Sequence, residues 1–472
     1  SEYGADYVAW SSDGSRISWS MGATHFTYDV SEFPLTERIQ TVSLAQSVPV
    51  DQPSQRLALV NARAVTMNPE REVIPQATVL IENDRIIRVG AASDIEVPTS
   101  YQSIDLAGKT ILPGFIDAHA HGPYGRDEII PQANWSLLAH LALGVTTIHN
   151  PSSRANQVFA AAEYQKAGKI LGPRIYSTGE IVYGAKSVGF ADVNGLDDAL
   201  RHVRRLKAQG AISIKNYNQP RREQRQQVNE AAWQENLLVV AEGGSLYHMD
   251  MNLVADGSSG IEHNIPTLAV YDDVLQFWGG SSTAYTPTLT VTYGGLTSED
   301  YFYQASDVWK HPILSQFVPP NRLQARAVRR VTAPESDYRD DDAAAVARQF
   351  QALGVMVNVG AHGQREGLAV HWEMWSFARG GMTPMQALET ATISPARHLG
   401  MEKDLGSLEP GKLADLVIVD GNPLEDVRLT DQIEKVILNG RLYDAATLAE
   451  EGQGSSPAPN LWWRGVPQFD IR

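Results

Sequence analysis

The stretch Leu112-Pro113-Gly114-Phe115-Ile116-Asp117-Ala118-His119-Ala120-His121 decides the fold that the sequence predicts. In it, an apolar run of strand length leads into two histidines that are separated by one residue. Because side chains alternate along a strand, both imidazoles point to the same side. Two neutral imidazoles at a strand end form half of a zinc-type site. A His-x-His pair alone is more often accidental than a metal site, so the rest of the chain must supply further ligands.

Length and composition narrow the classes of protein and partner. A chain of 472 residues predicts two to four domains with a large core. Its formal net charge of −16 argues against nucleic acid or an anionic membrane as a partner and favours a small molecule or a peptide. The sequence contains no cysteine, which excludes disulfides, thiolate zinc sites and cysteine nucleophiles. No run of about 18 apolar residues is present, so we expect no membrane span.

Residues 1–50 predict a separate piece of β-structure. From Tyr7 to Ser20, apolar and aromatic residues alternate with polar ones on both sides of Asp13-Gly14, which is typical of a hairpin. The segment Trp10-Ser11-Ser12-Asp13-Gly14 resembles the repeat of a TolB-type β-propeller, whose blades need neighbours to bury their faces. The resemblance implies a propeller upstream of Ser1, and with it a periplasmic or otherwise exported protein. A hairpin docked on the main domain is the alternative.

Two segments far apart in the sequence predict one small β-domain. Residues 55–112 and 401–447 both contain short strand-like runs that are separated by Asn, Asp, Gly and Pro positions. Because these runs flank the central region on both sides, we expect a composite β-sandwich built from the two chain ends. Residues 448–472 then form a tail, and its aromatic segment Leu461-Trp462-Trp463-Arg464 should dock on the chain's own surface or on a sister subunit of a homo-oligomer.

Between these ends, residues 113–400 alternate strand-like with helical runs. The helical run that starts after Asn134 carries an Asn cap. Eight strands followed by helices are the pattern of a (β/α)₈ TIM barrel, an α/β fold whose active site lies at the C-terminal ends of the strands. The strand-like runs begin at residues 111, 145, 174, 212, 237, 260, 284 and 355.

Ligand-capable residues occur where five of these strands end. Since the strand ends of a barrel converge on one face, these side chains should form one metal site. His149 also ends a strand and is expected to support the site, whereas His140, His202, His311 and His398 are expected to be structural or exposed. The predicted ligands are His119, His121, Lys215, Glu242, His263 and His362.

On these motifs the chain resembles the amidohydrolase superfamily, nearest to its imidazolonepropionase-like and prolidase-like members, including those fused behind a TolB-like propeller. The resemblance covers about residues 55–447 and is most specific at 113–121, 261–263 and 406–417. It implies a metal-dependent barrel beside a composite β-sandwich. It also implies hydrolysis of amide, ester or related bonds by a metal-activated water.

Carried over from the family, His119 and His121 are first-strand ligands and His263 is the sixth-strand ligand. Lys215 matches the lysine that many members carboxylate to bridge two metals. The alternative for Lys215 is pairing with a carboxylate or with an acid group of the substrate. Glu242 stands where the family has a histidine, and His362 stands where it has an aspartate.

The two departures are reciprocal, so the number of imidazoles and carboxylates is unchanged. This favours a rearranged but occupied centre with one or two divalent ions, zinc first and manganese or iron as alternatives. The general base is then His362 or Glu242, and His362 would protonate the leaving amine. Tyr217, Tyr293 and Arg365 lie in loops beside the predicted metals and are candidate substrate-binding residues.

Three functions are compatible with the sequence. The first is a metal-dependent amidohydrolase that cleaves a C–N bond of a small amide, cyclic amide or dipeptide-like substrate. The second is an ester or phosphotriester hydrolase on the same centre, which a substrate screen would distinguish. The third is a non-catalytic scaffold for a propeller, which failure to retain metal would support. Residues 298–342 could form a lid, and the tryptophans of His371-Trp372-Glu373-Met374-Trp375 are expected to pack in the core.

Overall fold

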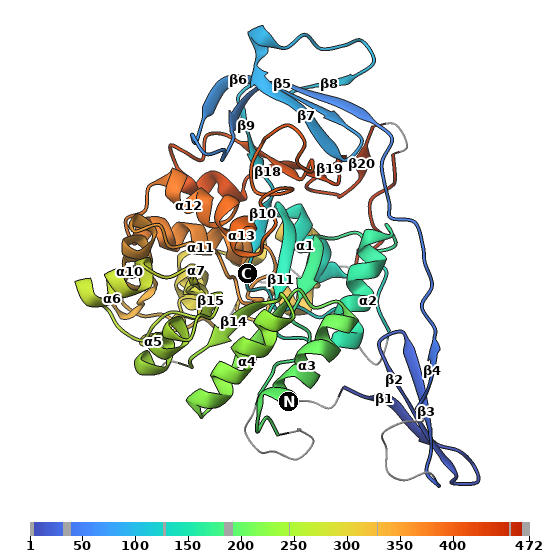
Figure 1. Ribbon diagram of the computed structural model, residues 1–472. Helices are drawn as coiled ribbons and strands as arrows, with labels where there is room; N and C mark the ends of the chain where they lie inside the picture. Colours follow the sequence, from blue (N-terminus) through green and yellow to red (C-terminus); the bar gives the residue numbers. More distant parts are fainter. Residues whose placement is uncertain are drawn as a thin grey trace.

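The computed structural model describes residues 4–31, 39–125, 129–183, 192–244, 246–327, 329–452 and 455–464. The parts of the predicted N-terminal segment and tail at 1–3, 32–38, 453–454 and 465–472 lie outside the described residues. Within the described ranges, no helix is both long enough and apolar enough to cross a membrane. The structure is a mixed α/β fold (Figure 1).

The two ends of the amidohydrolase-like region meet in one nine-stranded sheet, as expected from the sequence. The strand order is β20-β19-β18-β17-β9-β5-β6-β7, and β8 pairs in parallel with β5. Alternate side chains of these strands form an apolar cluster that includes Leu57, Val79 and Leu416. The strands are β5 (Arg56–Val65), β6 (Val73–Glu82), β7 (Arg85–Ala91), β8 (Gln102–Asp105), β9 (Lys109–Pro113), β17 (Leu416–Asp420), β18 (Ile433–Leu438), β19 (Arg441–Asp444) and β20 (Glu450–Glu451).

The stretch Leu112–His121 passes from this sheet into the parallel sheets of the central region at Gly114. Residues up to Pro113 belong to β9, which pairs with β17, whereas β10 (Phe115–Asp117) starts a parallel sheet. The Gly114 N–H donates to the carbonyl of Asp415 at 2.8 Å, and a Cβ at Gly114 would overlap the side chain of Thr146. Glycine therefore permits the close approach that joins the two sheets.

The central region contains a three-stranded and a four-stranded parallel sheet. The first is β10, β11 (Val145–Asn150) and β12 (Arg174–Ser177). The second is β13 (Ser213–Tyr217), β14 (Leu238–Glu242), β15 (Gly260–Glu262) and β16 (Ala284–Thr286). The helices between the strands are α1 (Trp135–Ala142), α2 (Ala155–Lys166), α3 (Leu196–Gln209), α4 (Arg222–Gln234), α5 (Tyr247–Ala255) and α6 (Asp272–Gly279).

The predicted eighth strand is present only as an isolated bridge, between Val357 and Tyr285 of β16. Backbone hydrogen bonds nevertheless connect this segment on both sides, because Asn358 N donates to Tyr285 O at 2.9 Å and Ala118 N donates to Val359 O at 3.0 Å. A second bridge joins Val182 to Asn216 of β13, on the side where β12 ends. The short pairing explains why an apolar run of strand length forms no regular strand here.

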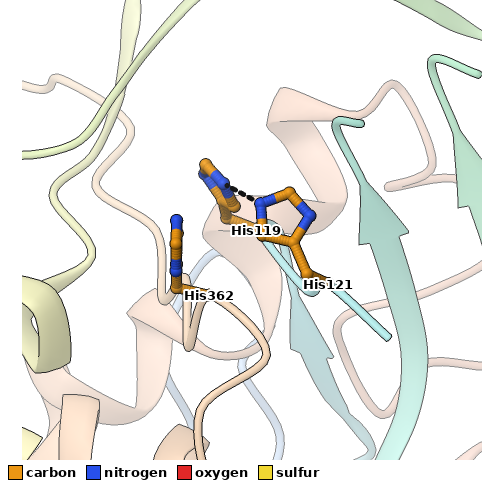
Figure 2. Close-up of side chains that lie close together, drawn as sticks. All are labelled: His119, His121 and His362. Atoms are coloured by element: carbon orange, nitrogen blue, oxygen red, sulfur yellow. Dashed lines mark hydrogen bonds between the residues drawn. The ribbon is translucent and has the colours of Figure 1, made fainter. Parts of the chain in front are cut away.

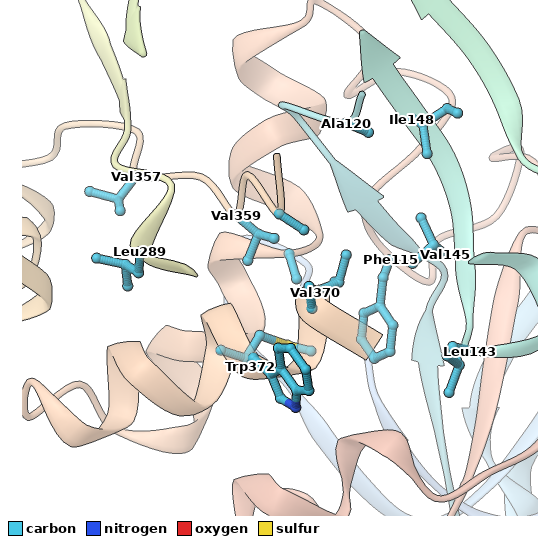
Figure 3. Packing of buried hydrophobic residues seen from close by; sticks show 14 of the residues in the cluster. Phe115, Ala120, Leu143, Val145, Ile148, Leu289, Val357, Val359, Val370 and Trp372 are labelled. Carbon is cyan, nitrogen blue, oxygen red and sulfur yellow. The ribbon is translucent and has the colours of Figure 1, made fainter. Parts of the chain in front are cut away.

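The apolar core lies between the parallel sheets and the helices that cover them (Figure 3). Phe115, Val145 and Ile148 from the first strands belong to the same buried cluster as Val359 and Trp372. Trp372 is buried and stacks on Phe302 at 4.9 Å, which confirms it as core packing. The strands that carry the site residues therefore pack against a tightly packed core.

The segment from the end of β16 to α13 contains most of the remaining helices. The predicted lid region, 298–342, contains several short helices and the start of α10. These elements are η2 (Leu289–Val291), α7 (Glu299–Ala305), η3 (Val308–Lys310), α8 (Leu314–Phe317), α9 (Pro320–Leu323), η4 (Glu335–Asp337), α10 (Asp340–Ala352), α11 (Leu368–Arg379), α12 (Pro384–Thr390) and α13 (Ile393–His398). The single-turn elements η1 (Ala92–Asp94) and η5 (Val427–Asp431) belong to the β-domain side of the chain.

The N-terminal hairpin is confirmed, and it is part of a four-stranded antiparallel sheet in the order β1-β2-β3-β4. Its register places Trp10, Ile17, Trp19, Phe26 and Tyr28 on one face. This sheet stands apart from the β5–β8 region in Figure 1, and an extended segment connects the two. The upstream propeller stays a prediction. The strands are β1 (Asp6–Trp10), β2 (Arg16–Met21), β3 (Thr24–Asp29) and β4 (Gln40–Ser43).

The described part of the tail docks on the chain itself. Leu461 and Trp463 are buried, and Arg464 Nη2 donates to the carbonyl of Gln316 at 3.3 Å. Trp462 stays 76% exposed. Intramolecular docking therefore accounts for most of this aromatic segment.

Candidate metal centre

Asp117 connects two strand ends at the site. Its Oδ1 accepts hydrogen bonds from the backbone N–H of His119 at 3.1 Å and of Ala361 at 3.0 Å. The backbone N–H of His362 in turn donates to the carbonyl of His119 at 2.6 Å. These bonds hold the end of β10 beside the segment that carries His362, although the two are far apart in the sequence.

Two of the predicted ligands have an uncommon backbone conformation. His263 has φ 71° and His362 has φ 58°, both in the left-handed region. This region costs free energy for residues that carry a Cβ, and such conformations gather at functional sites. Each histidine follows a segment of the parallel sheet, so a left-handed residue turns the chain sharply at the face where the strands end.

Four imidazoles converge at this face. The ring centroids of His119 lie 4.9 Å from His121, 5.1 Å from His263 and 5.0 Å from His362. The tightest group is His119, His121 and His362, whose ligand nitrogens all lie within 4.8 Å of one another (Figure 2). His119 is 1% exposed, and His121 and His362 are half-buried.

The hydrogen bonds of His121 fix which of its nitrogens is free. Asn150 Oδ1 accepts from the backbone N–H of Ser152 at 2.9 Å, and Asn150 Nδ2 donates to the Tyr124 hydroxyl at 3.1 Å. His121 Nδ1 lies 3.2 Å from the same Oδ1, so it must carry the proton and donate. The Nε2 of His121 is therefore left with a lone pair.

His119 is held in a similar way by a carboxyl group. Its Nδ1 lies 2.5 Å from Glu262 Oε2, and when Glu262 is ionised this oxygen can only accept, so Nδ1 then donates. The two Nε2 atoms of His119 and His121 then face each other at 3.2 Å. Two lone pairs at this separation repel unless a cation lies between them. The residues present thus fit a divalent metal, with ligand orientation of the kind found at metal-binding histidines.

His263 lines the other side of the cluster. Its Nδ1 lies 2.7 Å from Thr288 Oγ1, and its Nε2 lies 3.7 Å from Glu242 Oε2. The ring of Tyr293 stacks on His263, with the two centroids 5.2 Å apart. The predicted substrate-binding Tyr293 is therefore in direct contact with one of the four imidazoles.

Lys215 and Glu242 form a buried ion pair beside the imidazoles. Lys215 Nζ lies 3.0 Å from Glu242 Oε2, and the two side chains are 1% and 9% exposed. Asn218 Nδ2 donates to the other oxygen, Oε1, at 3.3 Å. This contact matches the pairing with a carboxylate that the sequence offered as an alternative for Lys215, and carboxylation of Lys215 stays a prediction. Tyr217 lies next to the pair, with its ring centre 6.0 Å from Lys215 Nζ.

Burial and nearby charge keep the imidazoles neutral. Burial, followed by the positive charge of Lys215, lowers the pKa of His119 well below its ordinary value and that of His121 to about 4. Burial also lowers the pKa of His263 and of His362 to about 3, with repulsion from His121 adding to the shift. Neutral imidazoles keep the lone pairs that a metal requires.

The pKa values of two carboxyl groups next to the imidazoles shift in the opposite direction. Burial raises the pKa of Glu262 to about 8 and that of Asp117 to about 7. Both groups are fully buried, and each has one oxygen without a hydrogen-bond partner. A cation at the imidazoles would stabilise their ionised forms, which is a second sign that the site suits a metal.

Residues 110–443 match the Amidohydrolase family. The chain belongs to the amidohydrolase family.

Several solved structures have a similar fold. A Xaa-Pro dipeptidase with bound methionine has a TM-score of 0.61 and 22% identity, covering 83% of this chain and 100% of its own. Molinate hydrolase has a TM-score of 0.64 and 17% identity over 83% of this chain and 95% of its own. The ochratoxinase of A. niger has a TM-score of 0.61 and 19% identity over 83% and 96%. At these identities the likeness shows the fold.

Curated relatives match this amidohydrolase over a short segment. A 5-methylthioadenosine/S-adenosylhomocysteine deaminase of Bacillus thuringiensis (strain Al Hakam) is 46% identical over 65 residues. That segment is 13% of this chain and 14% of the deaminase.

Arg365 of this amidohydrolase lies in a different network from the imidazoles. Its guanidinium carbon is 5.6 Å from the centre of the Tyr303 ring, and Nη1 is 3.8 Å from Glu366. Arg326 and Glu299 complete the network with a hydrogen bond of 2.6 Å. Nε and Nη1 of Arg365 are buried and have no hydrogen-bond partner. A role in binding substrate therefore stays a prediction.

The other histidines of this amidohydrolase are placed as expected. His149 is buried below the site, where Nδ1 donates to the carbonyl of Ala118 at 3.0 Å and Nε2 lies 2.7 Å from Ser213 Oγ. His140, His202 and His398 are buried outside the cluster, and His311 pairs with Asp431 at 3.4 Å.

Sequence reasoning missed the residues that orient the ligands. Glu262 directly precedes His263 on a buried strand, and Asn150 directly follows His149 at another strand end. A polar residue next to a histidine at the end of a buried strand is the sequence signal that could have identified them. Which ligand each one contacts depends on distant pairing, because Glu262 contacts His119 rather than its neighbour.

Proposed function

We propose that this chain is a metal-dependent hydrolase that cleaves a C–N bond of a small substrate. The observation that carries the proposal is the pair of facing Nε2 lone pairs of His119 and His121, with His362 beside them. Three convergent neutral imidazoles, two of which have a hydrogen-bonded outer nitrogen, form a facial ligand set that leaves coordination positions open.

His119, His121 and His362 are the proposed ligands, and zinc is the proposed ion because the set is rich in imidazole. When bound, the metal supplies Lewis-acid polarisation of the scissile carbonyl and lowers the pKa of water towards about 7. The half-buried His121 and His362 lie on the accessible side, where a substrate can approach.

The proposed proton carrier is Glu242. His362 is one of the three converging ligands, so it has no free lone pair for the role of base once a metal is bound. Glu242 lies beside His263 and keeps a carboxylate oriented by Lys215 and Asn218. It takes a proton from the attacking water as the C–O bond forms. It returns that proton to the leaving nitrogen as the C–N bond breaks, which yields a carboxylic acid and an amine.

The proposed substrates are dipeptide-like molecules, amides and cyclic amides. Support comes from the similarity to a Xaa-Pro dipeptidase and to molinate hydrolase. Tyr293 against His263 and Tyr217 against the Lys215 pair offer aromatic and hydroxyl contacts at the site. The Arg365 network is the proposed second contact region, for the charged end of a substrate.

The test is a substrate screen of the purified chain supplied with zinc, manganese or iron. The panel holds Xaa-Pro and other dipeptides, N-acyl amino acids and lactams, with esters, phosphotriesters and adenine nucleosides as competing classes. Hydrolysis of a C–N substrate, lost in Glu242→Gln and unchanged in Glu230→Gln, would support the proposal; Glu230 is an exposed residue of α4. If the chain hydrolyses only esters, or only deaminates adenine nucleosides, the proposed C–N hydrolysis is wrong and the chain has that other activity.

Metal retention separates catalysis from a scaffold role. The His362→Ala variant should lose bound metal, whereas His248→Ala should keep it, because His248 is exposed on α5. A wild-type chain that retains no metal after purification without chelators would favour the non-catalytic scaffold.

We also propose that the parallel sheets form a closed (β/α)₈ barrel and that the nine-stranded sheet forms a two-layer sandwich. The bonds from Ala118 to Val359 and from Asn358 to Tyr285 support closure on one side, and the Val182 bridge supports it on the other. The domain limits 1–50, 55–112 with 401–447, 113–400 and 448–472 remain our proposal.

A further inference from the structure

The loop at residues 288–293, which follows β16, is held at both ends by two consecutive residues after β15. At its start, Thr288 Oγ1 lies 2.7 Å from His263 Nδ1. At its end, Asn264 binds the backbone of Tyr293. The Asn264 Oδ1 accepts from the Tyr293 N–H at 2.6 Å, and Nδ2 donates to the Tyr293 carbonyl at 3.2 Å.

The middle of this loop is fixed as well, but the chain after it is not. Glu373 of α11 accepts from the backbone N–H of Leu289 at 2.9 Å and of Thr290 at 2.6 Å. Gly294 is exposed, has φ 91° and has no atom within 4 Å of its Cβ position. The hydrogen bonds therefore fix the loop as far as Tyr293, where the Asn264 side chain is its last contact.

Asn264 holds Tyr293 in one arrangement. Asn264 is 4% exposed, and its Nδ2 also donates to the Ile265 carbonyl at 3.3 Å. Because the Tyr293 N–H can only donate, it determines which end of the buried amide is the oxygen. The phenol ring of Tyr293 is thereby placed on His263, with the ring centroids 5.2 Å apart and the planes at 30°.

We propose that Asn264 is a positioning residue for substrate binding, which holds the Tyr293 hydroxyl where it donates a hydrogen bond to an oxygen of the substrate. This role rests on the proposed function and deepens it, because it assigns a contact that selects substrates with an acceptor oxygen beside the imidazoles. Tyr293 is half-buried, and a phenol is protonated at neutral pH, so its hydroxyl is a donor. Asn264 itself acts through Tyr293 and does not touch the substrate.

The expected effect of this arrangement is on binding. A ring that is already fixed loses little conformational freedom when a substrate arrives. Release of the Tyr293 backbone should therefore weaken binding of the substrate and leave the chemical step nearly unchanged.

The test is a double-mutant cycle on Asn264 and Tyr293 that measures the Kd of glycyl-L-proline by isothermal titration calorimetry. Metal-free protein is used, so that binding is measured apart from turnover. We expect Asn264→Ala and Tyr293→Phe each to raise Kd by about tenfold, the cost of one hydrogen bond. The double variant should bind no more than about twofold more weakly than Tyr293→Phe alone, because Asn264 acts through the lost hydroxyl. Asn321→Ala, at an exposed position of α9, is the control and should match the wild type.

Two further measurements separate positioning from a general loss of structure. In the metal-loaded protein, Asn264→Ala should raise KM by about tenfold and change kcat by less than about twofold. Hydrogen exchange of the Tyr293 amide should be faster in Asn264→Ala and unchanged in Tyr293→Phe, which leaves the backbone bond to Asn264 intact. Tyr293→Phe with an unchanged Kd, or additive effects in the cycle, would overturn the assignment.

Failure of this role and failure of the proposed function are distinguishable. Binding of glycyl-L-proline that depends on Asn264 and Tyr293, without turnover of any C–N substrate, would refute the function alone. Turnover with Kd and KM values that neither substitution changes would refute the role of Asn264 alone, and a wild-type chain that does not bind glycyl-L-proline would also refute it.

Discussion

The ligand histidines depend on partners that fix their protonation. Asn150 and Glu262 each accept from an Nδ1 and so direct an Nε2 lone pair into the cluster. Ser152 and Tyr124 hold Asn150 in turn, which leaves its amide no freedom to flip. We therefore expect the metal affinity of the proposed site to depend on residues that would not touch the ion.

Replacing Glu262 tests this dependence. In Glu262→Gln, a neutral amide replaces the carboxylate that accepts from His119 Nδ1, so the imidazole becomes a weaker and less oriented ligand. We expect metal affinity to fall by about 10- to 100-fold. Competition with a chromophoric chelator measures it, and Glu230→Gln is the control. An unchanged affinity would show that Glu262 serves packing alone.

Acid sensitivity should come from buried neutral histidines outside the site. His371 is buried, its Nε2 lies 2.9 Å from the Leu143 carbonyl, and burial lowers its pKa to about 4. In the unfolded chain the His371 imidazole binds a proton near pH 6.5. The stability that the neutral imidazole contributes is therefore fully present above that pH and is lost as the pH falls towards 4. Each such histidine contributes a loss of up to about 1.4 kcal/mol per pH unit.

Denaturant unfolding of metal-free protein at pH 7 and pH 5 measures this loss. The His371→Gln variant should lose less stability between the two values than the wild type, and His248→Gln should match the wild type. Equal losses in all three proteins would contradict the assignment.

At the scale of the elements, the ends of the strands carry the site and tight packing holds them together. Gly360 follows Val359, at the end of the predicted eighth strand, and precedes His362, whose backbone is in the left-handed region. A Cβ there would lie 2.6 Å from Thr286 Cγ2 and 2.8 Å from His119 Cβ. The absence of a side chain at Gly360 thus lets the last segment of the parallel sheets approach a metal ligand.

The Gly360→Ala variant should lower both stability and metal affinity. The added methyl group must displace the His119 side chain or the backbone, which costs about 1–3 kcal/mol. Gly195→Ala is the matched control, because no atom lies within 4 Å of its Cβ position and its φ is −161°. Thermal unfolding and chelator competition measure the two effects. A stable variant with normal metal affinity would show that the strand ends can adjust.

In the whole molecule, a buried ion pair joins the parallel sheets to the nine-stranded sheet. Arg174 of β12 donates through Nε to Asp415 Oδ2 at 2.7 Å and through Nη2 to Asn439 Oδ1 at 3.0 Å. Asp415 is 2% exposed and also accepts from the backbone N–H of Asn439. The two chain ends are thereby fixed against the region that carries the site.

Arg174→Met should destabilise the protein by about 3–5 kcal/mol, because it leaves the Asp415 carboxylate buried and unpaired. The double variant Arg174→Met/Asp415→Leu should recover part of that loss. A denaturant double-mutant cycle measures the coupling. If the double variant is no more stable than the single one, the damage lies in packing rather than in the unpaired charge.

The sequence by itself determined the elements and their order. The Asn134 cap of α1 and the hairpin at Asp13-Gly14 depend on local geometry, and the structure contains both. The strand before His119 and His121 is also present, but it ends at Asp117, so the two histidines lie beyond it rather than on alternate strand positions. The same local rule placed Glu242 at the end of β14 and His263 directly after β15, whereas Lys215 lies in the middle of β13, which continues to Tyr217. Pairing of the chain ends also followed, because matching strand patterns flank the central region.

Only the tertiary structure decided which of these residues meet. His362 joins His119 and His121 through a left-handed turn and the Asp117 bridge, while Lys215 and Glu242 neutralise each other instead. Those outcomes depend on register between strands that lie far apart in the chain and on burial, which sets the cost of an unpaired charge. Sequence periodicity specifies the direction of a side chain but carries no information about the partner that it will meet.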